Sequence, residues 1–78
     1  MASPHFPRKT LDKMKNSGIT ENDVLDTYNN GEHFTTSTGS HMMVKRYPSY
    51  GYEIGLYYIL DNFSGRSVIT HVWKRPII

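Results

Sequence analysis

The chain has 78 residues, of which 37% are hydrophobic and 13% aromatic, and this indicates one small globular domain with a modest core. It contains no cysteine, which excludes disulfides, thiolate nucleophiles and cysteine-ligated metals. The net charge of +2 is unevenly spread, because residues 1–17 and 45–78 each carry +3 while residues 18–44 carry −4. Two basic ends that meet in the fold would suit an anionic partner, and ordinary solvated charge is the alternative.

A first helix is expected over residues 7–16, after a lead-in at residues 1–6. Pro7 suits the first helical position, and Pro7, Leu11 and Met14 form a narrow apolar stripe. Gly18 is expected to end this helix in a left-handed conformation, with Ile19 covering the end.

A second helix follows at once and runs to about residue 30. Thr20 is its predicted N-cap, and Asp23, three residues on, completes a short relative of the capping box. The acidic first turn is explained by the positive end of the helix dipole, so we do not interpret it as catalytic.

From residue 32 the hydrophobic period changes to two, and turn residues separate four segments. They predict strands over residues 32–36, 41–47, 52–60 and 66–75. Short turns between consecutive strands favour an antiparallel meander, and the helices must cover one of its faces. The predicted fold class is therefore α+β: one domain, residues 1–78, with two N-terminal helices packed on one face of a four-stranded antiparallel sheet.

The last predicted strand, R-S-V-I-T-H-V-W-K-R, gathers polar and reactive side chains. Strict alternation places every second residue on the same face. It assigns one face to Ser67, Ile69, His71, Trp73 and Arg75, and the other to Arg66, Val68, Thr70, Val72 and Lys74. Neither face is purely apolar, which leaves two interpretations. Either one side of the strand packs in the core and the other is functional, or the strand is buried, with a hydrogen-bonded histidine and a charged C-terminal end.

Several kinds of chemistry lack their motifs. The four histidines show no helical His-x-x-x-His spacing, and there is no Walker loop, dinucleotide fingerprint or Gly-x-Ser-x-Gly elbow. The carboxylates fall at caps and turns, which disfavours a paired-carboxylate hydrolase. We therefore expect no metal and no small-molecule cofactor. No apolar run approaches the length of a membrane helix, so no membrane partner is expected.

A cationic and aromatic set remains in the sheet half of the chain. Cleavage of RNA by its own 2′-hydroxyl needs a base such as histidine, and a cation that stabilises charge on the phosphate. Aromatic rings can hold unstacked bases. Tyrosine also favours strands for packing reasons alone, which is the structural alternative for each tyrosine.

The helix carrying basic residues, the segment K-N-S-G-I-T-E-N-D-V-L-D-T-Y-N-N-G and the final R-S-V-I-T-H-V-W-K-R resemble the small ribonuclease-toxin domains that join barnase, EndoU, the tRNA-cleaving colicins and RelE. The G-I-T-E-N-D-V segment is similar to the helix start in toxin tips of contact-dependent and polymorphic systems. The resemblance spans most of the chain, but its motifs are short. It implies two helices on an antiparallel sheet, and RNA cleavage, often of tRNA, without metal.

Site residues follow from this resemblance by position. The N-terminal polar group corresponds to His5 or Lys9, and the sheet positions to Lys45 or Arg46 and to Thr70 and His71. His71 is the expected general acid or base, with His5 as a second and Lys9 assisting. The expected phosphate- and RNA-binding residues are Lys45, Arg46, Arg66, Lys74, Arg75, Tyr57 and Trp73.

The resemblance also implies an acidic immunity or antitoxin partner over the site. It implies action in the cytoplasm, after delivery from another cell as part of a larger protein. The alternative is a non-catalytic regulator of phage or antitoxin type that uses the same basic patch to bind nucleic acid or protein. A purely structural module would be favoured if the histidines and basic residues lay far apart.

Overall fold

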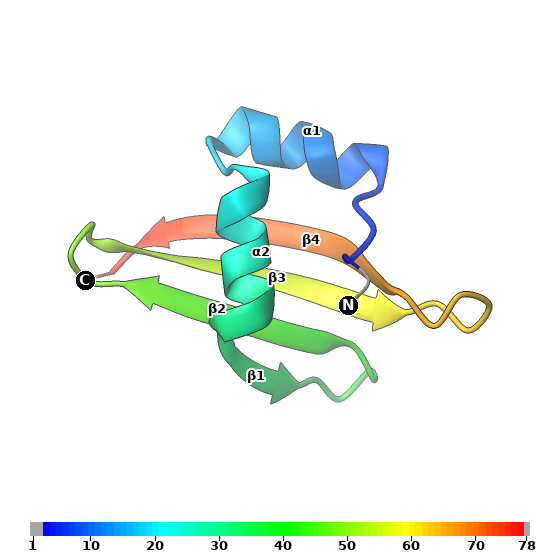
Figure 1. Cartoon of the computed structure of the whole chain (residues 1–78). Coiled ribbons are helices and arrows are strands. Elements are labelled where there is room, and N and C mark those ends of the chain that lie inside the picture. The colour runs from blue at the N-terminus through cyan, green and yellow to red at the C-terminus, as the bar shows by residue number, and fades with distance from the viewer. Residues whose placement is uncertain (1–2, 78) are drawn as a thin grey trace.

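Two helices precede a four-stranded antiparallel sheet in the computed structural model (Figure 1). The structure describes residues 3–77, so Met1 and Ala2 of the predicted lead-in lie outside the described residues. The elements are α1 (Arg8–Ser17), α2 (Glu21–Asn30), β1 (Glu32–Thr35), β2 (His41–Tyr47), β3 (Tyr52–Leu60) and β4 (Ser67–Pro76). The strands lie in the order β1-β2-β3-β4, which confirms the predicted α+β class.

Local interactions fix the junction between the two helices as the sequence predicts. Gly18 adopts φ 69°, and the amide of Ile19 donates to the Met14 carbonyl at 2.9 Å, which closes the end of α1. At the start of α2, the Asp23 amide donates to Thr20 Oγ1 and the Thr20 amide donates to Asp23 Oδ2, each at 3.1 Å. This reciprocal capping box satisfies two amides that the helix cannot pair itself.

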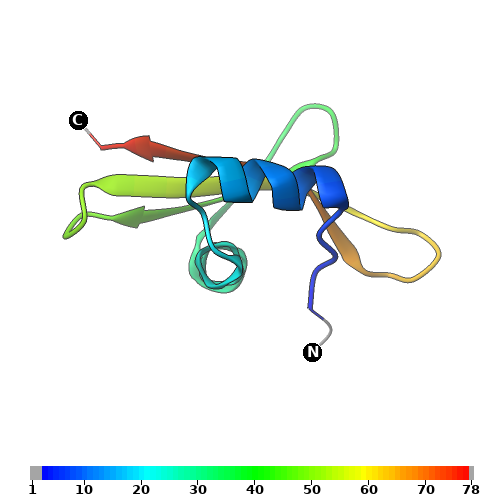
Figure 2. The same ribbon diagram turned by 90° about the horizontal axis from the view of Figure 1, so that it is seen from above.

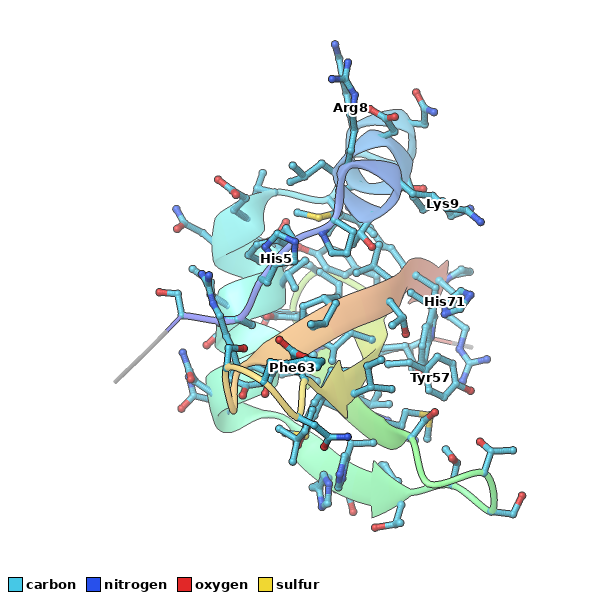
Figure 3. The ribbon with its side chains drawn as sticks, turned by 90° about the vertical axis from the view of Figure 1, so that its right-hand side faces the viewer. His5, Arg8, Lys9, Tyr57, Phe63 and His71 are labelled. Atoms are coloured by element: carbon cyan, nitrogen blue, oxygen red, sulfur yellow. The ribbon has the colours of Figure 1, made fainter. Side chains whose placement is uncertain are left out.

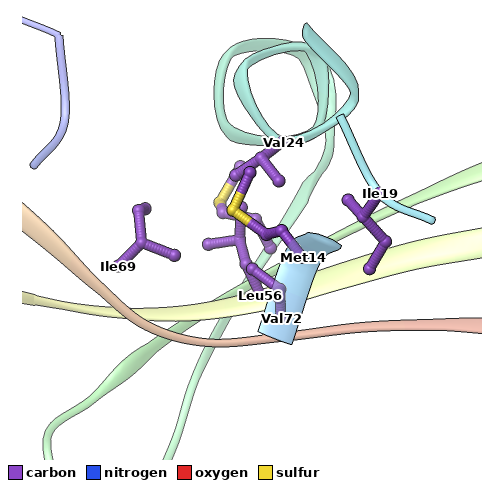
Figure 4. Close-up of a cluster of buried hydrophobic side chains, with 7 residues drawn as sticks. Met14, Ile19, Val24, Leu56, Ile69 and Val72 are labelled. Carbon is purple, nitrogen blue, oxygen red and sulfur yellow. The ribbon is translucent and has the colours of Figure 1, made fainter. Parts of the chain in front are cut away.

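The core lies between the helices and one face of the sheet (Figure 4). Its buried members are Met14, Ile19, Val24, Met43, Leu56, Ile69 and Val72. The predicted apolar stripe of α1 is wrong at Leu11, whose side chain is 38% exposed. Thr10 is buried in its place and donates to the Ile69 carbonyl at 2.7 Å, because α1 meets a strand edge that needs a hydrogen-bond donor.

A β-bulge in β4 overturns the strict alternation predicted for this strand. Tyr57 pairs with His71, but the next residue, Tyr58, pairs with Ile69, which leaves Thr70 as an extra residue. Ile69 and Val72 therefore both enter the core, although they are three residues apart. His71 and Trp73 lie on the opposite side of the sheet from Ile69.

Helix α1 and the segment before it cover the edge of β4. The amide of His5 donates to the Ser67 carbonyl at 2.8 Å, and the amide of Ile69 donates to the His5 carbonyl at 3.0 Å. Seen from above, α2 lies on one side of the sheet and the β1–β2 loop on the other (Figure 2). We call the side away from α2 the open face. Neither described helix is long and apolar enough to cross a membrane.

Candidate functional site

Two adjoining hollows share Thr70 and His71 of β4 as lining residues. One lies on the open face and the other lies between β4 and α1. The first, of about 330 Å³, lies on the open face and is also lined by Tyr57 and by hydroxyl groups of the β1–β2 loop. The second, of about 140 Å³, lies between β4 and α1 and is also lined by Lys9 and Lys13. His71 thus has hydroxyl groups on one side and ammonium groups on the other.

The hydrogen bonds around His71 select one form of its ring. Thr70 Oγ1 donates to the Tyr57 carbonyl at 3.3 Å, so its oxygen is left to accept a hydrogen bond. His71 Nδ1 lies 3.3 Å from that oxygen and is the donor in this arrangement. A neutral ring with Nδ1 as the donor has its lone pair on Nε2.

Tyr57 supports the same ring from the side. The Tyr57 and His71 rings meet edge to face, with centroids 6.0 Å apart and an interplanar angle of 89°. This is a favourable geometry for two aromatic rings. The bulge creates the arrangement, because it pairs His71 with Tyr57 across the two strands.

Lys9 and Lys13 stand one turn apart on α1 and face the same hollow. Within residues 3–77 neither forms an ion pair, so both ammonium groups are available to an anion. Figure 3 shows Lys9 on the side of His71 and Tyr57, whereas the neighbouring Arg8 points away from them.

A second group of site residues lies further along the open face. The indole of Trp73 packs closely against Gly55 of β3, and its ring centroid is 5.2 Å from that of Tyr57. Beyond it, the buried carboxylate of Glu53 is 3.0 Å from Arg75 Nε and 3.8 Å from Arg46 Nε. A hollow of about 390 Å³ adjoins these charges.

Four predicted site residues lie elsewhere. Lys45 and Lys74 are on the helix-covered side of the sheet: Lys45 Nζ is 2.6 Å from Asp26 Oδ2 on α2, and Lys74 Nζ lies 4.2 Å from the centroid of the Tyr52 ring. Arg66 Nε donates to the Ser3 carbonyl at 2.7 Å, at the other end of β4. His5 pairs with that same end through its backbone and lies apart from His71 (Figure 3).

The structure therefore brings together Lys9, Thr70, His71 and Tyr57, and places Trp73, Arg46 and Arg75 on the same open face. Lys13 was not among the predicted site residues, although its spacing of four from Lys9 on a helix was the available signal. Glu53 was also missed, because nothing local indicates that a strand carboxylate is buried between two arginines from neighbouring strands.

A histidine pair lies outside this site, on the helix-covered side. His33 Nε2 and His41 Nδ1 are 2.9 Å apart, and the His41 ring stacks on Tyr58 with centroids 4.8 Å apart. Among residues 3–77, no three histidine or acidic side chains lie close enough to hold a metal ion.

Comparison with known proteins gives no relative: no family model matches the chain, and neither a curated protein nor a solved structure is significantly similar to it. The functional interpretation therefore depends on the site itself.

Proposed function

We propose that this domain is an endoribonuclease that cleaves RNA, with tRNA among its candidate substrates, by attack of the 2′-hydroxyl on the neighbouring phosphate. One observation carries the proposal: the exposed His71 borders a hollow that is also lined by Lys9 and Lys13, which form no ion pair within residues 3–77. A base and a cluster of cations around one point are the groups that this reaction requires.

The proposed reaction uses His71 and Lys9 in opposite roles. His71 Nε2 accepts the proton of the 2′-hydroxyl while that oxygen forms a bond to phosphorus. The bond from phosphorus to the 5′-oxygen breaks, and the Lys9 ammonium gives a proton to the leaving oxygen. The products are a 2′,3′-cyclic phosphate and a 5′-hydroxyl. Lys13 stabilises the negative charge that builds on the phosphate. No metal-bound nucleophile is needed, because the nucleophile belongs to the substrate.

His5 has no part in this mechanism. Its backbone is hydrogen-bonded to Ser67 and Ile69, so His5 lies beside the start of β4, apart from His71. The proton donor for the leaving oxygen is therefore assigned to α1, which is the element that faces His71.

Two matched pairs of variants test these roles on purified protein incubated with total tRNA in EDTA. We expect His71→Ala to lower the cleavage rate by about 10²- to 10⁴-fold, the range of general base catalysis, and His5→Ala to retain it. Lys9→Gln should also lose activity, whereas Arg8→Gln should not, because Arg8 points away from the site (Figure 3).

Equal activity of His71→Ala and wild type would remove the assigned base. Equal losses in Lys9→Gln and Arg8→Gln would show that only net charge matters. Circular dichroism of each variant checks that the fold is retained.

The charge of the site also defines its inhibitor. Lys9, Lys13 and the exposed Arg46 and Arg75 give the rim positive charge, so a neutralising immunity or antitoxin protein would present acidic side chains. Such a partner, and action in the cytoplasm of a target cell after delivery as part of a larger protein, belong to the proposal.

A further inference from the structure

We call the partly exposed indole of Trp73, on the open face, the platform. Gly55 lies directly beneath it, and a Cβ at that position would collide with the indole atoms Cζ2 and Cε2. Gly55 is thus required by the close approach of the ring to the backbone. Trp73 is partly exposed on the open face, whereas its Nε1 is buried.

The polar group of this indole is not used. Trp73 Nε1 is the one buried side-chain nitrogen or oxygen within residues 3–77 that has no hydrogen-bond partner. Buried tryptophans usually give this N–H a partner, because leaving it unpaired is costly. The close approach of the indole to Gly55 is therefore kept although it leaves Nε1 without a hydrogen-bond partner among the described residues.

Next to the platform on the open face, Arg46 and Arg75 both form ion pairs with the buried carboxylate of Glu53. Glu53 is 8% exposed, while the side chains of Arg46 and Arg75 are 73% and 66% exposed. The contacts to Glu53 use Nε of both arginines, and within residues 3–77 no hydrogen bond involves their terminal amino groups. Two cations against one carboxylate leave a positive charge, with geometry suited to phosphate.

The platform stands between these arginines and the proposed cleavage site. His71, Trp73 and Arg75 are alternate residues of β4 on the open face. A strand advances about 3.3 Å per residue, so His71 and Arg75 are separated by about 13 Å. An extended nucleic acid strand can therefore contact His71, Trp73 and Arg75 in turn.

The geometry points to a path for single-stranded RNA across the open face, from His71 over the Trp73 platform to the Arg46–Glu53–Arg75 cluster. An unpaired base stacks on Trp73, and a phosphate beyond it binds the two arginines. This inference rests on the proposed ribonuclease function and defines its substrate as unpaired RNA, since a base inside a duplex cannot reach the indole.

Trp73 is the only tryptophan of the chain, so its fluorescence reports on the platform directly. The probe is a short single-stranded 2′-O-methyl RNA, which has no free 2′-hydroxyl and is not cleaved by the proposed reaction. We expect saturable quenching of Trp73, and no comparable quenching when the same probe is annealed to its complement. Equal quenching by duplex, or binding of the single strand without quenching, would overturn the inference.

Neighbouring residues of β4 give a matched control for the arginines. Arg75→Gln and Lys74→Gln each remove one positive charge, but Lys74 lies on the helix-covered side over Tyr52. We expect Arg75→Gln to weaken binding of the probe and to lower the slope of log affinity against log salt by about 0.7, while Lys74→Gln changes neither. Equal effects of both changes would remove the arginine cluster from the path.

Gly55→Ala tests the platform without changing any charge. The added methyl group collides with the indole and lifts it, so quenching by the probe should fall in a variant whose circular dichroism is unchanged. If it does not fold, Trp73→Leu is the second variant, and binding is then followed with a fluorescent label on the probe. Unchanged affinity of a folded platform variant would contradict the inference.

Failure of this inference is distinguishable from failure of the proposed function. Cleavage of RNA by wild type without quenching of Trp73 would overturn the path and leave the ribonuclease assignment standing. Quenching by single strands without any cleavage of unmodified RNA would support the path and refute the enzyme.

Discussion

At the scale of single residues, the shortest ion pair within residues 3–77 joins Asp26 to Lys45 on the helix-covered side of the sheet. The Asp26 carboxylate accepts hydrogen bonds from Lys45 Nζ and Tyr47 Oη, each at 2.6 Å, and from Asn30 Nδ2 at 2.8 Å. The hydrogen bond from Lys45, and then those from Tyr47 and Asn30, lower the pKa of Asp26 to about 2. Burial, and then the hydrogen bond to this carboxylate, raise the pKa of Tyr47 to about 12. This cluster links α2 to β2, and it gives Lys45 a structural role in place of the predicted role in binding phosphate.

Replacing Asp26 should make stability depend on pH in a defined direction. The pKa of Asp26 is lower in the folded state than its ordinary value of 3.8, so its stabilisation is fully present above about pH 4 and is lost as pH falls toward about 2. The side chain is 35% exposed, so we expect Asp26→Asn to cost only about 1 kcal/mol near neutral pH. Urea unfolding of both proteins measures this difference, which should shrink as pH falls below about 4 and be mostly lost near pH 2. A difference that persists there would contradict the role of the charge.

At the scale of elements, the bulge in β4 decides which residues form the site. Thr70 is the extra residue, and it turns His71 and Trp73 to the open face while Ile69 stays in the core. Without the bulge, His71 would share its face with Ile69 and point toward the helices. The same Thr70 then orients the His71 ring through its hydroxyl oxygen.

The packing of α1 on the edge of β4 also determines the composition of the site, because it places Lys9 and Lys13 next to His71. Thr10→Val removes the hydrogen bond to the Ile69 carbonyl while keeping the shape of the side chain. Since both groups are buried, we expect a loss of about 1 to 2 kcal/mol in the free energy of unfolding. The exposed Thr35→Val on β1 should stay within about 0.5 kcal/mol of wild type. Denaturant unfolding that showed equal stability for the three proteins would contradict this role of Thr10.

The elements themselves were predictable from the sequence, because their signals are local. Thr20 with Asp23, Gly18 with Ile19 and the period of two in the strands each act over a few residues. The site was predictable only in part. Thr70 fits a regular strand as well as a bulge, so the alternation of β4 was wrong from the sequence. Lys45 was assigned to the site because a single sequence does not reveal which face of the sheet the helices cover.

At the scale of the whole molecule, the two basic ends of the chain lie against each other, which is the condition under which the charge pattern would suit an anionic partner. Helix α1, from the first basic segment, lies against β4, from the second, while the acidic middle segment forms α2 on the covered side of the sheet (Figure 1). This docking places Lys9 and Lys13 beside His71. The resulting positive field around His71 favours an anionic substrate and is expected to weaken at high salt.

The most direct test of the proposed enzyme asks whether cleavage depends on the 2′-hydroxyl. Wild-type protein is incubated in EDTA with an RNA oligonucleotide and with the same sequence carrying 2′-deoxyribose throughout, and the new ends are identified by mass spectrometry. We expect cleavage of the RNA alone, with 2′,3′-cyclic phosphate and 5′-hydroxyl ends that disappear in His71→Ala. Intact RNA at high protein concentration, or equal cleavage of the deoxyribose strand, would contradict the proposed mechanism.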